Sequence, residues 1–480
     1  MLGIVLDRTL SRSLGSQLCD ELRSRIVSGA LKGGAQLPST RELARELSLS
    51  RTLVLEAFEQ LAAEGYIEGL RGSGSFVRSG SALQGSALPG LAALSPELRA
   101  RSFAAPTRGP TPRPVDFRPG VPALDQFPRE AWARALGEAA RSLPTKALGY
   151  GEGAGLMRLR EEVAAYLFRS KGVRAQAEEV FITSGCSQSL GLISRALLRG
   201  SPRGRAVLEN PCQPAVSGLL RREGVELVAA AVDEEGLDPS SLPRDRSAVA
   251  FVTPSHQYPL GPVLSAPRRT ELVEWARATD SVLVEDDFDG EFRYGGAPLQ
   301  PLRELEPSRV VYLGSFSKSF SPALRLGYAI TPPSLRETWL AYRELMDIHS
   351  CAFTQAAMAA VLGSGAFERH VRRMRRLYAS RREAMLGLLR GAFGADVRVM
   401  GEAAGLHLAI SFEGSRFRGL RFDEERVARI ASAGALVYPA MRYAFAPLRG
   451  ADRILLLGYG NLDEEEMGRG IEALAASISK

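Results

Sequence analysis

The stretch Val310-Val-Tyr-Leu-Gly-Ser-Phe-Ser-Lys318-Ser-Phe-Ser-Pro-Ala-Leu-Arg325 places a lysine just after a short apolar run, among small hydroxyl residues. The apolar run predicts an inner strand of a parallel sheet, and α/β proteins bind ligands at the carboxyl ends of such strands. A lysine that forms an imine must lose a proton, which partial burial near another cation favours. Lys318 is therefore a candidate Schiff-base lysine, with Arg325 as the nearby cation. Taken alone, the stretch also fits a surface lysine in a serine-rich loop.

Two upstream segments each end in residues that also suit ligand binding. In Ser281-Val-Leu-Val-Glu-Asp286-Asp287-Phe288-Asp289, a predicted strand runs into a group of acids. A carboxylate at such a strand end can keep a pyridinium nitrogen protonated. In Val180-Phe-Ile-Thr-Ser-Gly185-Cys186-Ser187, a predicted strand and a turn of small residues lead into a helix, whose free N–H groups would suit a phosphate. Each segment alone is weak evidence for a ligand site, but together the three segments predict a site for pyridoxal 5'-phosphate (PLP).

With Leu148-Gly-Tyr150-Gly-Glu-Gly-Ala-Gly155 and Thr253-Pro-Ser-His-Gln-Tyr258-Pro-Leu-Gly261, these segments resemble the fold-type I, aspartate-aminotransferase-like family of PLP proteins. The resemblance implies that Lys318 carries PLP and that Asp286 pairs with its pyridine nitrogen. It implies further that the phosphate is bound by Gly185, Cys186, Ser187, Ser315 and Arg325, with Tyr150 reaching it from a second subunit. Arg453, in Arg453-Ile-Leu-Leu-Leu-Gly458, resembles the arginine that grips a substrate carboxylate, although a structural ion pair is nearly as well supported.

Two positions depart from this family's pattern. Phe288 stands where a tyrosine usually lies near the phenolic oxygen of the cofactor, and Gln213 stands where a stacking aromatic residue is expected. Tyr258, at a position where simple aminotransferases have asparagine, is a candidate for supplying the missing hydroxyl. The alternative role for Tyr258 is that of a core or interface residue. Both departures predict a cofactor that is held less tightly, or stacked by another residue.

The first 78 residues carry a separate pattern. Leucine and isoleucine recur at helical spacing between residues 14 and 26, and Ser39-Thr-Arg41-Glu42 is a capping box that predicts the start of a second helix. A third helix is predicted from Ser50 to Gly65, followed by a hairpin with a glycine-rich tip at residues 69–74. This order of elements predicts a winged helix-turn-helix.

Within this pattern, Pro38-Ser-Thr-Arg41-Glu-Leu-Ala44, Ser50-Arg51-Thr52 and Arg71-Gly72-Ser-Gly74 resemble the GntR family of bacterial repressors. The resemblance implies that Arg41 and Arg51 contact bases or phosphates of double-stranded DNA. Leu53 stands where the family often has a hydroxyl, and Thr52 is the candidate to replace that contact. The candidate DNA-binding residues are Ser39, Arg41, Arg51, Thr52, Arg71, Gly72 and Gly74. Solvated helix surface is the alternative for the two arginines.

Composition limits how the chain could bind DNA, where it could be located and whether it could bind metal. The chain has a net charge of +7 but no polybasic arm. Specific DNA binding would therefore depend on a few placed arginines. Residues 79–115 are rich in Ser, Gly, Pro and Ala, which predicts a linker. No apolar run is long enough to span a membrane and no signal peptide is present, which predicts a cytoplasmic protein. Four scattered cysteines predict reduced thiols and no metal.

A winged helix fused in front of an aminotransferase-like body resembles the MocR subfamily of GntR regulators. The predicted protein is α/β, with a DNA-binding domain at 1–78, a linker at 79–115 and a PLP-binding effector domain at 116–480. We expect a homodimeric, PLP-dependent transcriptional regulator that binds a DNA operator and senses an amine, an amino acid or PLP itself. The alternative is a PLP-dependent aminotransferase with an appended DNA-binding headpiece.

Overall fold

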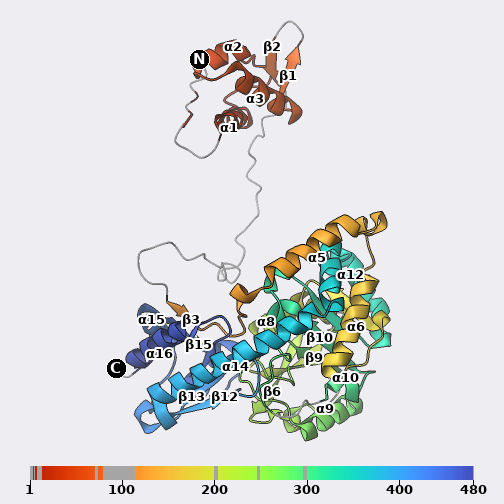
Figure 1. Ribbon diagram of the computed structural model, residues 1–480, viewed down its shortest axis with the longest axis vertical. Helices are drawn as coiled ribbons and strands as arrows, with labels where there is room; N and C mark the ends of the chain where they lie inside the picture. Colours follow the sequence, from red (N-terminus) through yellow and green to blue (C-terminus); the bar gives the residue numbers. More distant parts are fainter. Residues whose placement is uncertain are drawn as a thin grey trace. The chain divides into compact units, whose positions relative to one another are not determined.

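The computed structural model describes residues 4, 6, 7, 13–70, 74–78, 114–198, 204–245, 249–295 and 300–478. The chain divides into two compact units, Met1–Gly109 and Pro110–Lys480, called here the headpiece and the body (Figure 1). The predicted wing residues Arg71 and Gly72, and residues 79–113 of the predicted linker, lie outside the described residues. None of the helices in the described ranges combines the length and apolar character needed to cross a membrane.

The described part of the headpiece contains three helices and a hairpin. They are α1 (Leu14–Val27), α2 (Thr40–Glu46), α3 (Arg51–Ala63) and the antiparallel strands β1 (Ile67–Leu70) and β2 (Gly74–Val77). The predicted capping box is present, because the Ser39 N–H donates to Glu42 at 2.9 Å and the Glu42 N–H donates to Ser39 Oγ at 3.2 Å. A shared apolar core with fully buried Leu22, Val54 and Leu61 holds the helices together. The predicted winged helix-turn-helix is confirmed.

The body is built on an eight-stranded sheet of order β4-β11-β10-β9-β8-β5-β6-β7. From β10 to β6 the neighbouring strands are parallel, whereas β11 runs antiparallel to both β10 and β4. The prediction of a parallel inner strand before Lys318 is therefore confirmed. The bounds are β4 (Val180–Thr183), β5 (Arg205–Asn210), β6 (Glu226–Asp233), β7 (Gly236–Leu237), β8 (Val249–Val252), β9 (Val282–Asp287), β10 (Val310–Ser315) and β11 (Gly327–Ile330).

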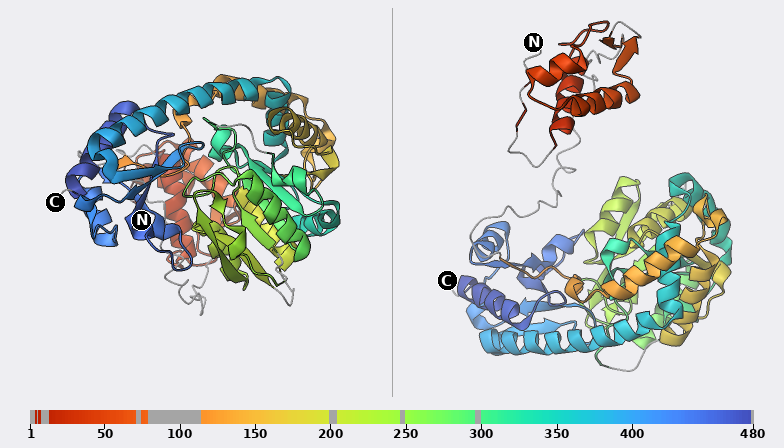
Figure 2. Two further views of the ribbon diagram at one scale, coloured as in Figure 1. Left: turned by 90° about the horizontal axis from the view of Figure 1, so that it is seen from below. Right: turned by 45° about the horizontal axis from the view of Figure 1, so that its top comes forward.

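Helices cover both faces of this sheet (Figure 2). Along β9 and β10, Val284 and Val311 are buried with residues of α7, α8 and α12. The alternate residues Leu283 and Val310 are buried on the other face with residues of α9, and Tyr312 with residues of α6 and α13. The helices are α5 (Arg129–Ser142), α6 (Met157–Lys171), α7 (Cys186–Ile193), α8 (Pro214–Arg222), α9 (Ala266–Ala278), α10 (Leu302–Leu305), α11 (Phe316–Ser319), α12 (Arg336–Asp347) and α13 (Ala352–Gly363).

A second, smaller sheet completes the body. The 28-residue helix α14 (Ala366–Phe393) leads from the helices around the large sheet to this one (Figures 1 and 2). Strand order is β12-β13-β16-β15, and α14 and α16 pack against it around a large apolar core. The bounds are β12 (Val397–Met400), β13 (His407–Phe412), β15 (Tyr438–Pro439), β16 (Ile454–Gly458), α15 (Glu424–Ser432) and α16 (Glu464–Ile478), with β14 (Ala435–Leu436) paired to β3 (Val115–Asp116).

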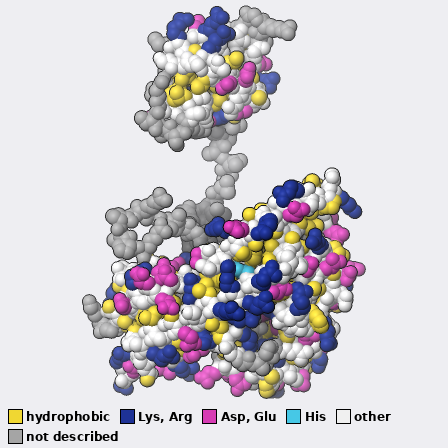
Figure 3. Space-filling view, viewed as in Figure 1, with side chains coloured by type: hydrophobic (Ala, Val, Ile, Leu, Met, Phe, Trp, Pro, Cys, Tyr) yellow, Lys and Arg dark blue, Asp and Glu magenta, His cyan; other side chains and the backbone are white. Residues whose placement is uncertain are grey.

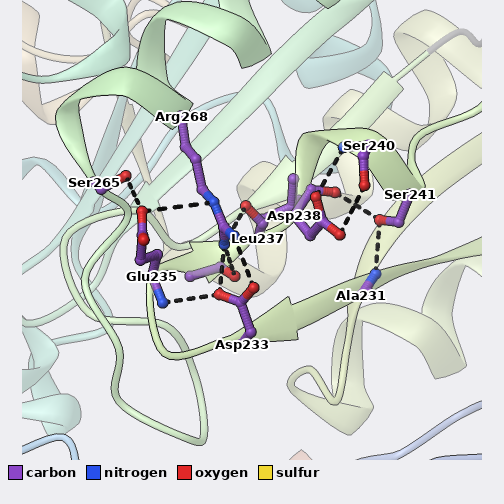
Figure 4. Close-up of polar contacts among 10 residues, drawn as sticks. Ala231, Asp233, Glu235, Leu237, Asp238, Ser240, Ser241, Ser265 and Arg268 are labelled. Carbon is purple, nitrogen blue, oxygen red and sulfur yellow. Dashed lines mark hydrogen bonds and ion pairs between the residues drawn. The ribbon is translucent and has the colours of Figure 1, made fainter.

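The edge of the large sheet is held by a polar network around Arg268 of α9 (Figure 4). The Arg268 guanidinium donates to both carboxylate oxygens of Asp233, at 2.5 and 2.7 Å, and to the Gly236 carbonyl at 3.1 Å. The Ser265 hydroxyl donates to Glu235 at 2.9 Å. These bonds tie the β6–β7 turn to α9, so the acids at this edge are structural.

Candidate functional site

A cavity of about 240 Å³ lies at the carboxyl ends of β9 and β10. The parallel register pairs Leu313 of β10 with Asp286 of β9, so the chain that leaves β10 toward Lys318 starts beside Asp286. The structure brings together most of the residues predicted to bind PLP. The lining includes Cys186, Ser187, Gln213, Tyr258, Asp286, Phe288, Ser315, Lys318 and Arg325. A larger hollow, of about 730 Å³, lies between the β6–β7 turn and β12 and contains none of them.

Asp286 is a buried carboxyl group with an open hydrogen-bonding position. Burial raises its pKa to about 7. The Cys186 thiol donates to Asp286 Oδ2 at 3.3 Å, while Oδ1 is buried and has no partner among the described residues. A buried carboxylate is stabilised by a positively charged donor, and a protonated pyridine nitrogen is such a donor. Asp286 therefore fits the predicted contact with PLP.

Replacing Asp286 by asparagine is expected to stabilise the PLP-free protein, increasingly as the pH rises from about 4 to about 7. The Asp286 pKa, raised from 3.8 to about 7, means that the folded state retains a proton that the unfolded state loses, so folding becomes less favourable across this window. Asparagine carries no proton to lose. The gain in the free energy of unfolding should be larger at pH 8 than at pH 5 by on the order of 2–3 kcal/mol. Urea unfolding at both pH values measures it, and equal gains would contradict this origin.

Lys318 lies in the short helix α11, which Ser315 caps by accepting a hydrogen bond from the Ser317 N–H at 3.1 Å. Burial lowers the pKa of Lys318, and the charges of Asp289 and Asp286 partly oppose that shift. The amine therefore loses its proton more readily than an exposed lysine, as attack on an aldehyde requires. A side chain at Gly120 would place its Cβ 3.4 Å from Nζ, so glycine leaves room beside the amine.

Arg325 supplies a cation at the start of α7. It adopts a left-handed backbone conformation with φ of 48°, and its Nη2 lies 3.2 Å from where a Cβ on Gly185 would be. Within the described part of the chain, its guanidinium forms no ion pair or hydrogen bond. The first N–H groups of α7, those of Cys186 and Ser187, have no acceptor within the helix. A guanidinium beside free N–H groups at a helix start suits a phosphate.

The residues that depart from the family pattern also meet at the cavity. The Tyr258 and Phe288 rings are in edge contact, with centroids 5.5 Å apart. Burial and the neighbouring Tyr443 raise the pKa of Tyr258, so its hydroxyl stays protonated and can donate. Gln213 lines the cavity just before α8. Tyr258, the candidate for supplying the hydroxyl that Phe288 lacks, therefore lies against Phe288 in the cavity lining.

Two predicted side chains do not reach this cavity, and Gly185, just before α7, is also absent from its lining. Tyr150 is 87% exposed and absent from the lining, so its contact with a partner's phosphate remains a prediction. Arg453 is exposed at the end of a short turn (Ala451–Arg453), just before the buried strand β16. Arg453 is thus not positioned to bind a carboxylate in its own chain's cavity. Among the described lining residues, only Lys318 and Arg325 are cationic.

The sequence analysis missed a buried network next to Lys318. Asp289 Oδ2 lies 2.9 Å from His256 Nδ1, and the His256 and His407 rings are 5.1 Å apart. Burial, with His256 close by, lowers the pKa of His407 to about 3, so His407 is neutral. Since Asp289 is the charge that most opposes the lowered pKa of Lys318, this network positions a counter-charge for the lysine. The three side chains bring metal-ligand atoms within 4.8 Å of one another, so the absence of metal remains a prediction.

Asp287 serves a different purpose from its neighbours. Its side chain is bound by Lys171 and by the Tyr312 hydroxyl, and Lys171 Nζ also lies 3.1 Å from Glu291. The pKa of Asp287 is lowered by Lys171 and these hydrogen bonds, although burial opposes the shift. Strand alternation separates Asp287 from Asp286, so only part of the acid run faces the cavity.

In the headpiece, the described DNA-binding candidates lie at the helix starts and at the wing. Arg41 and Arg51 occupy the first turns of α2 and α3, are exposed and form no ion pair or side-chain hydrogen bond with another described residue. Ser39 and Thr52 are exposed beside them, and Gly74 begins β2 with φ of 107°. The arrangement leaves both guanidinium groups available to an anionic partner.

Comparison with known proteins identifies both units. Residues 14–77 match the bacterial regulatory proteins of the gntR family, and residues 114–442 match aminotransferase class I and II. The chain is 34% identical to the HTH-type pyridoxine biosynthesis transcriptional regulator PdxR of Corynebacterium glutamicum, over 100% of this chain and 99% of that protein. It is 32% identical to the probable rhizopine catabolism regulatory protein MocR of Rhizobium meliloti, over 99% and 96%. The chain belongs to the MocR subfamily of GntR regulators.

Membership of the MocR subfamily explains the two units. The body is similar to the crystal structure of the alpha-aminoadipate aminotransferase LysN of Thermus thermophilus, complexed with N-(5'-phosphopyridoxyl)-L-leucine. The TM-score is 0.68 at 29% identity, and the match covers 76% of this chain and 92% of LysN. The predicted fold-type I body is confirmed. The chain is a DNA-binding transcriptional regulator with an aminotransferase-like domain, and the full-length relatives described above are named as regulators.

Proposed function

We propose that the body binds PLP at Lys318 and that PLP occupancy controls the binding of the headpieces to a DNA operator. The observation that carries the proposal is the cavity itself. It combines a buried carboxyl on Asp286, a lysine with a lowered pKa and an arginine at a helix start, and one Asp286 oxygen and the arginine have no partner among the described residues. These are the three chemical groups that a phosphorylated pyridine aldehyde requires.

Each group has a distinct task. Asp286 would accept the hydrogen bond of the pyridine nitrogen, and Arg325, Ser315 and the N–H groups of Cys186 and Ser187 would bind the phosphate. Lys318 would bind the aldehyde carbon, while Asp289 holds a counter-charge near its amine. When bound, PLP supplies an electron-withdrawing ring. For a regulator, the useful property is that PLP attaches to the lysine covalently but reversibly. The fraction of occupied sites then follows the PLP concentration.

PLP is favoured over an amino acid as the signal. A planar guanidinium is the usual partner of an amino-acid carboxylate, and both described cations of the cavity are needed for PLP itself. Phe288 and Gln213 replace the tyrosine and the aromatic residue that the family pattern would place against the cofactor, which favours reversible binding. One relative is named as a regulator of pyridoxine biosynthesis, which fits a PLP-responsive protein. An effect of amino acids on operator binding, beyond that of PLP, would identify an amine or amino-acid effector instead.

The proposed active form is a homodimer. Leu148, two residues before Tyr150, is 56% exposed, and Leu345 of α12, the helix against which Gly153 lies, is 85% exposed. A second copy that covers this surface would bury it and would bring Tyr150 to the partner's cavity. Two headpieces would then bind paired half-sites. Sedimentation as a monomer, with a footprint of a single half-site, would contradict this arrangement.

The regulator is distinguished from an aminotransferase by turnover. An aminotransferase must release a keto acid and restore its starting state repeatedly, so it needs a firmly held cofactor and a grip on the substrate carboxylate. We expect purified protein to give only slow, incomplete half-reactions with amino acids. Rapid multiple turnover with an amino donor and a keto-acid acceptor, together with no effect of any ligand on DNA binding, would establish the aminotransferase.

Replacing Tyr258 by phenylalanine is expected to weaken PLP binding about fivefold, which corresponds to the loss of one hydrogen bond worth about 1 kcal/mol. The reason is that the Tyr258 hydroxyl is the replacement for the one absent at Phe288. Fluorescence titration with PLP measures the affinity. Tyr342→Phe, outside the cavity, serves as the matched control. Equal affinities for the two variants would end the compensation hypothesis.

A further inference from the structure

Helix α14 carries an exposed stripe of arginines along one face. The stripe consists of residues at spacings i, i+3, i+4 and i+7, which share one side of a helix: Arg369, Arg372, Arg373 and Arg376, all exposed. The opposite side is buried in the apolar cores of the body, through Val371, Met374 and Tyr378. Helix α14 is therefore anchored by one face and presents four positive charges on the other.

The charges of this arginine stripe are not neutralised within the described residues. Arg372 and Arg376 form no ion pair or hydrogen bond there. The guanidinium groups of Arg369 and Arg373 donate to backbone carbonyls, of Ser364 at 3.1 Å and Gln126 at 2.8 Å, which leaves their charge uncompensated. Glu368, the acid of the same turn, is already paired with Arg169 at 2.6 Å. The stripe is thus a site of positive charge that no described acid neutralises by an ion pair.

The arginine stripe also destabilises the helix that carries it. Like charges at spacings of three and four residues repel, and neighbouring arginines of the stripe meet at both spacings. At Arg372 and Arg376, no contact with another described residue requires arginine. Figure 3 shows Lys and Arg side chains gathered over the middle of the face of the body on which α14 lies in Figure 1. A surface that concentrates unpaired guanidinium groups suits a polyanion.

We propose that the arginine stripe binds the phosphate backbone of DNA that flanks the operator. The inference rests on the DNA-binding function of the headpiece, which brings the same chain to a duplex. A flanking phosphate backbone is then the polyanion at the highest effective concentration near the body. The contact reads no bases, since phosphates carry no sequence information directly. It adds salt-sensitive affinity, and it gives the ligand-binding body its own contact with DNA.

The test compares the full-length variant Arg372→Gln/Arg376→Gln with wild type on two duplexes. The short duplex holds only an operator recovered by selection from random DNA, and the long duplex extends it with random sequence on both sides. Neither substitution breaks a contact among the described residues. Arg174→Gln/Arg429→Gln removes two exposed arginines that lie off α14 and also lack described side-chain partners, so it is the matched control.

On the long duplex, the stripe variant is expected to bind about tenfold more weakly than wild type near 0.15 M salt. The slope of log K against log salt concentration should fall by about 2, since each lost phosphate contact contributes about 0.9. On the short duplex, it should match wild type. Unchanged binding to the long duplex, or an equal loss in the control, would overturn the proposal. Failure of wild type to select any operator would instead overturn the DNA-binding function on which it rests.

Discussion

Replacing Lys318 by alanine is expected to abolish covalent attachment of PLP. The chain contains five lysines. Among the described residues, Lys318 is the lysine that lines the cavity. Because burial lowers its pKa, the amine becomes neutral and nucleophilic more readily than the amine of an exposed lysine. After incubation with PLP and reduction with borohydride, peptide mapping of wild type should place the label on Lys318. The alanine variant should carry none.

The control for this labelling is Lys146→Ala, which removes an exposed lysine and should retain full labelling at Lys318. Labels spread over several lysines would indicate nonspecific modification by excess PLP. A label on another lysine in wild type, or no label at saturating PLP, would contradict the assignment of the cavity.

Replacing Arg41 or Arg51 by alanine is expected to cost about 1–3 kcal/mol of operator binding per residue, which is about 5- to 150-fold in affinity. Both guanidinium groups are exposed in the first turns of α2 and α3 and are unpaired within the described residues. PLP binding should be unchanged, because the headpiece and the body are separate compact units. Binding of a labelled operator, followed by fluorescence anisotropy, measures the loss.

Arg25→Ala is the matched control in the headpiece. Arg25 lies in α1, paired with Glu21 at 2.8 Å, and its replacement should leave operator binding nearly unchanged. Retention of sequence-specific binding by both Arg41→Ala and Arg51→Ala would mean that another surface of the headpiece contacts the bases.

Local signals in the sequence predicted the elements that carry most of the site. The capping box at Ser39 and Glu42 involves residues three positions apart, so it is visible in the sequence and present in the structure. The parallel strand before Lys318 was predicted from its apolar run. The meeting of Lys318 with Asp286 followed from the rule that parallel strands end at one edge of a sheet.

Features that depend on distant contacts were not predictable in the same way. His256, Asp289 and His407 come from three separate segments, and only the folded chain brings them together. Arg453 has a familiar sequence context, but its exposure depends on where β16 begins. The arginine stripe of α14 was hidden in the whole-chain charge of +7, because acids elsewhere in the chain offset it.

The dependence of operator affinity on PLP tests the proposed regulation most directly. PLP-free wild type and Lys318→Ala would be titrated with PLP at fixed salt, and the affinity for the selected operator measured at each concentration. A regulatory coupling of about 1–3 kcal/mol predicts that wild-type affinity rises or falls by about 5- to 150-fold and then saturates, while Lys318→Ala shows no response. Wild-type affinity that stays constant while Lys318 becomes fully labelled would contradict the proposed control of DNA binding by PLP.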